Sequence, residues 1–203
     1  MAPSTEDILG FWFGAAPTDE DAVPSHMRRW FGADQTVDAE LSRRFGAAMT
    51  AAARSELDGW AETARGRLAL ILLLDQCPRS THRGYPAAFE QDALALSWTL
   101  DGLADAMDRQ LEPFERMFFY MPMQRAESLD SQEGSVEIFS ELARADVPAF
   151  MITAMRNTAD FARLHRDIIA RFGRFPHRNA VLNREFTADE REYLEEGAPT
   201  FGQ

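Results

Sequence analysis

Residues 161–184 read FARLHRDIIARFGRFPHRNAVLNR and hold the pattern that decides the fold. Aromatic, aliphatic and histidine side chains recur there at the 3.6-residue period of an amphipathic helix, at Phe161, His165, Ile168 and Phe172. Gly173 can take the left-handed conformation in which many helices end. The segment therefore predicts the end of a long helix over 149–172, followed by a sharp change of direction.

The same segment is strongly basic, although the chain as a whole is acidic. Within residues 163–178, only Asp167 opposes five arginines, which are Arg163, Arg166, Arg171, Arg174 and Arg178. The whole chain has a formal net charge of −12. Pro176 suits the first position of a new short helix, where free backbone amides favour anions. This basic segment therefore either pairs with carboxylates of neighbouring helices or holds an anion.

Composition limits the class of protein. Hydrophobic residues at 45% and charged residues at 27% are typical of a globular protein, and 203 residues suit one domain over 1–203. The acidic balance argues against nucleic acid and anionic membranes as partners. A single cysteine, Cys77, excludes an internal disulfide. Residues 1–10 lack a secretory pattern, and the aliphatic run 68–74 is far shorter than the roughly 20 residues that span a bilayer. We therefore expect a cytoplasmic protein of unknown oligomeric state.

Several chemistries lack their residues. All 21 basic residues other than histidine are arginine, so a lysine Schiff base and a P-loop lysine are excluded. No HExxH, CxxC, GxSxG or glycine-rich phosphate loop occurs. The histidines lack metal-ligand spacing; they are His26, His82, His165 and His177. We therefore expect neither a metal nor a cofactor.

The remaining chain reads as helices separated by proline and glycine. Predicted helices cover 4–13, 36–57, 66–76, the segment from Pro86 to about Leu103, 113–122 and 128–142. A last short helix should follow the capping box at Thr187, and residues 15–25 should form a loop. Residues 66–76 are the central buried helix, which should end before Pro78. No alternating run is long enough for a strand. The sequence therefore predicts an all-α domain of antiparallel helix pairs.

Two of these helices have a predicted inner face. The helix after Pro86 should bury one stripe, formed by Phe89, Ala93, Leu96, Leu100 and Leu103. The helix over 128–142 should bury another, formed by Leu129, Gln132, Val136 and Phe139.

A first candidate cluster follows the central helix. Asp75 falls in the last helical turn, where the negative end of the dipole disfavours an acid by up to about 1 kcal/mol. We therefore predict that Asp75 is buried and bonded to Arg79 or Arg83. Two interpretations stay open, since the pair either locks the turn or orients an arginine toward a ligand.

The second cluster lies in the basic segment. Arg171 and Arg174 flank a helix C-terminus, which stabilises cations without any ligand. The sequence His177-Arg178-Asn179 beyond Pro176 has no such explanation. We expect Arg174, His177 and Arg178 to face a cleft shared with Arg79 or Arg83, oriented by Asp75 and Glu127. His165, on the apolar stripe, fits a core histidine.

Five segments together resemble the largely bacterial family known as domain of unknown function 924. They are ILGFWFG, RWF, RLALILLLDQCPRSTHRG, ERMFFYMPMQRAES and HRDIIARFGRFPHRNAVLNR, the last followed by FTADE. The resemblance implies a fold similar to that of tetratricopeptide-repeat proteins, a right-handed array of helix pairs, and no established activity. The family pattern maps onto these residues: Asp75, Gln76, Pro78, Arg79, Arg83, Glu127, His165, Arg171, Arg174, His177, Arg178 and Asn179.

This chain departs from the family pattern at five positions. Cys77 replaces the usual phenylalanine, Ser80 an asparagine, His82 a tyrosine, Arg125 a histidine and Asn183 a glycine. Asparagine tolerates left-handed geometry, so the change at Asn183 is benign. Arg125 cannot act as an acid or base in the way a histidine can.

Three classes of function stay open. The first is binding of a small anionic ligand, a carboxylate or phosphate, in a cleft lined by arginine and histidine. Its ligand-binding residues would be Arg79, Arg83, Arg174, His177, Arg178 and Asn179, supported by Asp75, Gln76, Glu127, His165 and Arg171. The others are a tetratricopeptide-like protein–protein interaction module and a hydrolase of unknown substrate. An exposed apolar groove would favour the module and a closed polar pocket the ligand binder.

Overall fold

The computed structural model describes residues 2–15, 17, 19–199 and 201 of the chain. These residues form helices and no strand, which confirms the all-α class. The α-helices are α1 (Thr5–Phe13), α2 (Val23–Phe31), α3 (Gln35–Ala53), α4 (Ala64–Ile71), α5 (Cys77–Thr81), α6 (Asp92–Ala104), α7 (Pro113–Arg125), α8 (Leu129–Leu142), α9 (Ile152–Phe172) and α10 (Ala188–Glu195). The 3-10 turns cover Asp58–Glu62, Pro86–Ala88, Met107–Gln110, Ala149–Met151 and Pro176–Arg178, and a π-helical turn covers Leu72–Gln76. Within the described residues, no helix is both long and apolar enough to cross a membrane.

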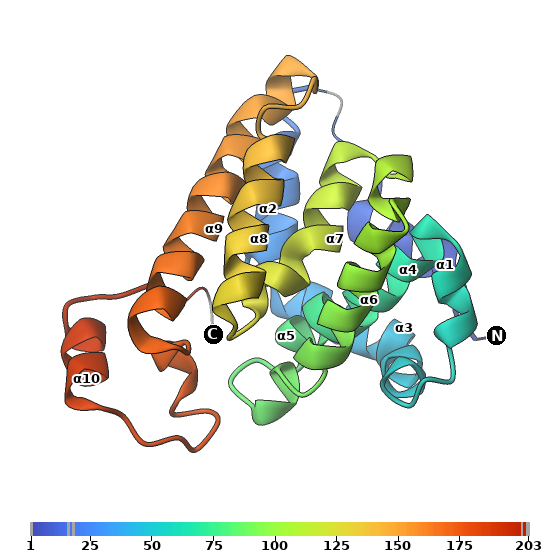
Figure 1. Ribbon diagram of the computed structural model, residues 1–203. Helices are drawn as coiled ribbons and strands as arrows, with labels where there is room; N and C mark the ends of the chain where they lie inside the picture. The colour runs from blue at the N-terminus through green and yellow to red at the C-terminus, as the bar shows by residue number, and fades with distance from the viewer. Residues whose placement is uncertain (1, 16, 18, 200, 202–203) are drawn as a thin grey trace.

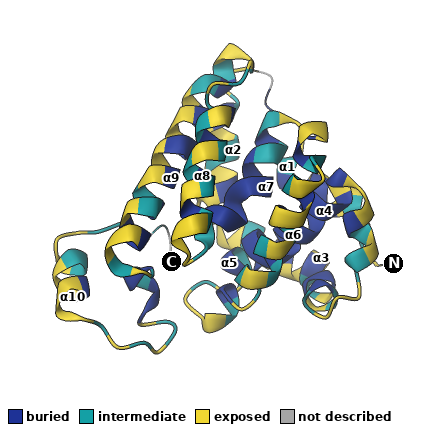
Figure 2. Ribbon diagram, viewed as in Figure 1, coloured by how far each residue is buried: buried dark blue, intermediate teal, exposed yellow. Residues whose placement is uncertain are grey.

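Helices α7, α8 and α9 lie side by side, and each runs antiparallel to the next (Figure 1). On the other side of the molecule α1 and α3 pack against the segment from α4 to α5. That segment forms the centre, because residues 68–74 are at most 1% exposed. Figure 2 shows the buried residues gathered along α4 and α7. The predicted central buried helix is therefore confirmed, whereas the tetratricopeptide-like order of the helix pairs stays a prediction.

The prediction that the central helix ends before Pro78 is wrong. The amide of Cys77 bonds to the carbonyl of Leu72, five residues back, and the widened turn continues directly into α5. Proline has no amide hydrogen and crowds the preceding turn, so a π-helical turn just before it relieves both problems. As a result Asp75 and Arg79 lie in the interior and not on a surface loop.

Pro122 does not close its helix either. Helix α7 continues through Pro122 to Arg125, with Met121, Pro122 and Met123 all buried. The hydroxyl of Thr99 donates to the carbonyl of Phe119 at 3.0 Å, in the turn that Pro122 disturbs. Tertiary packing therefore keeps the last turn helical, and this turn carries Arg125 towards the start of α8.

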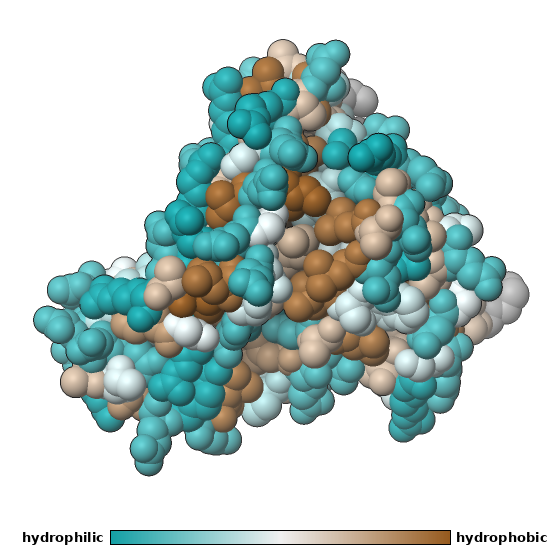
Figure 3. All heavy atoms as spheres, viewed as in Figure 1, coloured by the Kyte–Doolittle hydropathy of each residue, from teal (hydrophilic) through white to brown (hydrophobic). Residues whose placement is uncertain are grey.

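The predicted inner face after Pro86 is only partly confirmed, because Phe89 is buried and Leu103 packs against the core, but the fully buried positions of α6 are others. The buried positions are Ala95, Thr99 and Gly102, while Ala93 and Leu100 are exposed. A Cβ atom at Gly102 would lie 2.5 Å from the Phe119 ring, so the small residues allow a close approach that the leucines would prevent. Figure 3 shows hydrophobic side chains left on the surface over α6 and α7.

Several helix ends agree with the sequence. Ser128 caps α8, Thr187 forms the capping box of α10, and Gly173 ends α9 with a φ of 70°. The predicted loop over 15–25 is too long, because α2 begins at Val23. The helix predicted over 36–57 ends at Ala53. Besides Ala93 and Leu100, two more residues of predicted apolar stripes are exposed, Leu129 at 43% and Phe161 at 51%.

Candidate functional site

The π-helical turn after α4 carries Asp75 into the interior, where its side chain is not exposed to solvent. Arg79 pairs with this carboxylate at 2.9 Å and reaches Asp92 of α6 at 2.8 Å. The amide of Gln76 also donates to the Asp75 carboxylate. The prediction that Asp75 is buried and bonded to Arg79 is therefore confirmed. A buried carboxylate needs a compensating charge, and Arg79 provides it.

Arg178, on the 3-10 turn that begins at Pro176, meets the same acidic group. Its guanidinium lies 3.4 Å from the Asp92 carboxylate and over the rings of Phe89 and Phe175, at 4.9 and 4.4 Å from their centres. Burial, and then the charge of Arg79, lowers the pKa of Arg178 to about 9. Two segments far apart in sequence thus place two buried arginines on one carboxylate.

Arg125, the last residue of α7, adds a third guanidinium. Its Nε atom is shielded from solvent and has no hydrogen-bond partner, and within the described residues its side chain forms no ion pair. Burial, and then repulsion by Arg79, lowers the pKa of Arg125 to about 10. The three guanidinium groups are opposed by the carboxylates of Asp75 and Asp92. One positive charge is therefore left over, and we call these five residues the arginine cluster.

Two histidines border the arginine cluster and add no charge to it. His165 is buried, its Nδ1 atom lies 2.7 Å from the carbonyl oxygen of Phe161, and its ring stacks on Phe201 at 4.0 Å between centres. Burial, and then the charge of a nearby arginine, lowers the pKa of His165 and of His177 to about 3. Both rings are therefore neutral at pH 7. Since Nδ1 of His165 donates to a carbonyl, its Nε2 atom is left as an acceptor.

Arg125 lies on the walls of two pockets. The first has a volume of about 510 Å³ and is formed mainly by α2, α7 and α9; its lining includes Met27, Phe31, Met121, Gln124, Arg125, Thr158, Phe161, His165 and Phe201. The second has a volume of about 430 Å³ and lies beside α6; its lining includes Phe89, Asp92, Leu96, Arg125, Glu127, Arg178 and Leu182. We call the first the apolar pocket and the second the acidic pocket.

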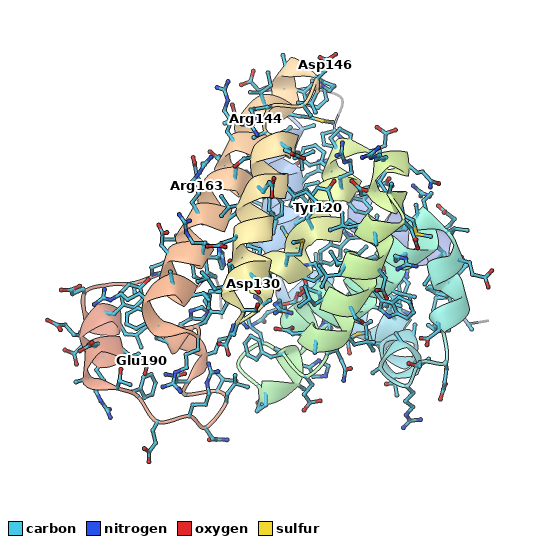
Figure 4. All side chains as sticks on the ribbon, viewed as in Figure 1. Tyr120, Asp130, Arg144, Asp146, Arg163 and Glu190 are labelled. Atoms are coloured by element: carbon cyan, nitrogen blue, oxygen red, sulfur yellow. The ribbon has the colours of Figure 1, made fainter. Side chains whose placement is uncertain are left out.

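Arg174 and Asn179 are engaged elsewhere. The guanidinium of Arg174 holds the carboxylate of Glu190 at 2.6 and 2.8 Å, and the amide of Asn179 donates to the same group. Glu190 lies on α10, which Figure 4 places at the far lower left of the molecule. The hydrogen bond from Arg174 lowers the pKa of Glu190 to about 2. For Arg174, pairing with a neighbouring helix therefore describes the structure better than a ligand cleft does.

The other predicted residues also have partners of their own. Glu127 pairs with Arg184 at 2.7 Å and accepts a hydrogen bond from the backbone amide of Phe175, so it acts on the cluster only through the attraction of its charge for Arg178. Arg83 lies 3.3 Å from Asp38 of α3. The guanidinium of Arg171 lies over two rings of its own end of the molecule, Phe172 and Tyr193.

The sequence interpretation missed Arg125, Asp92 and Phe201 as parts of this site. In the sequence, Arg125 stands out as a departure from the family pattern, but its surroundings favour a solvated charge, and its half-buried side chain with a shielded Nε atom shows that this expectation is wrong. Asp92 lies on a helix whose inner face was wrongly predicted. Nothing in the local sequence connects Phe201 with His165, because their contact depends on how the chain returns after α10.

This all-α fold with a buried arginine cluster has relatives. The chain belongs to a family of bacterial proteins of unknown function, DUF924, whose model matches residues 8–198. It is similar to the structure of a protein of unknown function from Agrobacterium tumefaciens, ATU0120, with 38% sequence identity and a TM-score of 0.79. That similarity covers 95% of this chain and 97% of the other. No curated protein matches the chain.

Proposed function

We propose that this protein binds a small anion at the arginine cluster, with Arg125 as the principal contact. The observation that carries the proposal is the guanidinium of Arg125, which lies among two other arginines without a carboxylate of its own in the described residues. This revises the cleft expected from the sequence, because Arg79 and Arg178 remain in it and Arg174 does not.

The charge balance supports an anion. A guanidinium that loses water without gaining a partner destabilises the folded protein, and the lowered pKa of Arg125 reflects that cost. An anion would restore the missing interaction through charge-assisted hydrogen bonds, for which the planar guanidinium fork is well suited. Arg79 and Arg178 are already paired with Asp75 and Asp92. They would therefore attract the anion through their positive charge and form few new hydrogen bonds with it.

Calorimetric titration with acetate and with phosphate tests the proposal. The wild-type protein should bind at least one of these ions. Arg125→Met should weaken that binding at least about tenfold, because a charge-assisted bond contributes about 1.5–3 kcal/mol. The matched control is Arg43→Met, which removes the same charge from an exposed position on α3. Binding of neither ion, or equal losses in both variants, would refute the proposal.

A further inference from the structure

The apolar pocket indicates what kind of anion would reach Arg125. Its walls are rich in flexible and aromatic apolar side chains, among them Met27, Phe31, Met121 and Phe161. Phe31 is 43% exposed and Phe161 is 51% exposed. Exposing two large apolar rings to water costs free energy, which an apolar ligand covering them would recover. In Figure 1, α2, which carries Phe31, lies behind α7 and α8, so this pocket is on the face turned away from the viewer.

The buried polar groups in this pocket are mostly engaged already, whereas Arg28 and Asn157, which also line it, are exposed. The Thr158 hydroxyl donates to the carbonyl of Ala154 at 2.9 Å, and the Nδ1 atom of His165 is used by a backbone carbonyl. The Gln124 amide makes a long contact of 3.5 Å to the Thr158 carbonyl. The guanidinium of the half-buried Arg125, with its shielded Nε atom, is therefore the strongest donor left for a ligand inside the pocket, because the guanidinium of Arg28 is exposed to water.

The charge of the site favours a monoanion. In the arginine cluster, three guanidinium groups and two carboxylates leave a single positive charge, and the neighbouring histidines are neutral. Arg28 also lines the apolar pocket, but it is exposed, so water screens its charge. A second negative charge on the ligand would lie near the carboxylates of Asp75 and Asp92 without a buried cation to balance it. A carboxylate carries one charge at pH 7, whereas a phosphate group carries between one and two.

From these observations we infer that the ligand is a monocarboxylate with an apolar acyl or aryl body, whose carboxylate contacts Arg125 and whose body fills the apolar pocket. This inference rests on the proposed function and adds the class of ligand. A volume of about 510 Å³ lies within the range of pockets that hold small organic molecules. The adaptable methionine side chains suit a body of variable shape.

Titration of the full chain with acetate, butanoate, hexanoate and octanoate tests the inference. Each buried methylene should tighten binding about fourfold until the pocket is full. Phosphate, added in a parallel titration, should bind more weakly than hexanoate. Arg125→Met should weaken every member of the series, while its thermal unfolding curve checks that it is folded.

Two apolar variants locate the body of the ligand. Phe161→Ala shortens a half-exposed side chain of the apolar pocket and should reduce the gain per methylene, with acetate binding unchanged. The matched control, Leu100→Ala, truncates an apolar residue on α6 that is 43% exposed and does not line this pocket, and it should leave the whole series unchanged. Leu182→Ala, in the acidic pocket, should also have no effect.

The outcomes separate the two proposals. Anion binding that is independent of chain length, or a chain-length gain that Leu182→Ala removes and Phe161→Ala does not, would overturn the inference and leave the proposed function standing. Binding of no anion at all would overturn both. A gain per methylene that Phe161→Ala removes would establish the apolar pocket as the site of the acyl body.

Discussion

At the scale of single residues, the buried Asp75 and the half-buried Arg125 are opposite cases of charge withdrawn from water. Asp75 is fully buried and paired with Arg79, while Arg125 faces two other arginines without a carboxylate of its own in the described residues. Breaking a buried ion pair leaves an uncompensated charge in the folded protein, whereas removing a charge that has no partner eliminates one. A neutral substitution should therefore destabilise the folded protein at Asp75 and stabilise it at Arg125.

Asp75→Asn should lower the free energy of unfolding by about 3 kcal/mol and the melting temperature by several degrees, because Arg79 would lose its fully buried carboxylate and keep only the partly exposed one of Asp92. Differential scanning calorimetry measures this shift. Asp167→Asn is the control, since that carboxylate is mostly exposed in its pair with Arg166 and should contribute less than about 1 kcal/mol. Equal shifts in the two variants would contradict a stabilising role for the buried pair.

Arg125→Met should raise the melting temperature by a few degrees in buffer without added anions. The methionine keeps most of the apolar contacts of the arginine and removes a charge that burial and Arg79 disfavour. Stability lost to an unpaired group is typical of binding sites, where the ligand restores it. If Arg125→Met instead unfolded at a clearly lower temperature, Arg125 would have a structural partner and the proposed anion site would lose its basis.

At the scale of secondary structure elements, the sequence predicted the ends of helices better than it predicted which helix face is buried. Ser128, Gly173 and Thr187 act through hydrogen bonds and dihedral angles within a few residues, so local sequence is sufficient to identify them. Pro78 and Pro122 were misjudged because tertiary packing maintains a helix through both. A proline weakens a helix locally, but the helices buried around it decide whether the chain continues.

Helix α6 shows why its inner face was not predictable. The leucine stripe gives the stronger helical periodicity, yet the helix packs through Ala95, Thr99 and Gly102. Close approach to the central helix needs small side chains there, and that requirement comes from Phe119 and Arg67 on other elements. Hydrophobic periodicity measures what a helix would gain by burial and carries no information about how near its neighbour lies.

Gly102→Ala tests this packing. The new methyl group would lie 2.5 Å from the Phe119 ring and 2.6 Å from the Arg67 side chain, so overpacking should lower the free energy of unfolding by about 1–3 kcal/mol. Gly46→Ala is the matched control, because nothing lies within 4 Å of its Cβ position on α3. That substitution should stabilise the helix by up to about 1 kcal/mol. Chemical denaturation measures the free energy of unfolding of both variants. If both substitutions changed it in the same direction, the close approach of α6 to Phe119 and Arg67 would be contradicted.

At the scale of the whole molecule, the candidate site is assembled from α5, α6, α7 and the turn after α9. Sequence reasoning found Asp75, Arg79 and Arg178, because an acid at a helix end and arginines beyond a proline are unusual locally. It placed Arg174 in the ligand-binding set and left Arg125 out, because nothing in the local sequence tells which of these two arginines near the end of a helix has a carboxylate partner. Only the position of Glu190, on a helix that follows much later, satisfies one of them and leaves the other unpaired.

The last prediction concerns acid stability, which the histidines at this site should limit. The pKa of His165 and of His177 is about 3 in the folded protein, against about 6.5 in an unfolded chain. Between these pH values the unfolded chain binds more protons than the folded protein, so the stability contributed by the neutral histidines is complete above about pH 6.5 and decreases as the pH falls.

Thermal unfolding between about pH 7 and pH 5 reports these histidines, because carboxylates such as Glu190 add their effect only below about pH 4.5. The double variant His165→Gln/His177→Gln should begin less stable and change little over the same range. A wild-type melting temperature that stays constant from pH 7 to pH 5 would show that one or both rings accept a proton in the folded state, and the arginine cluster would then carry more than one uncompensated charge.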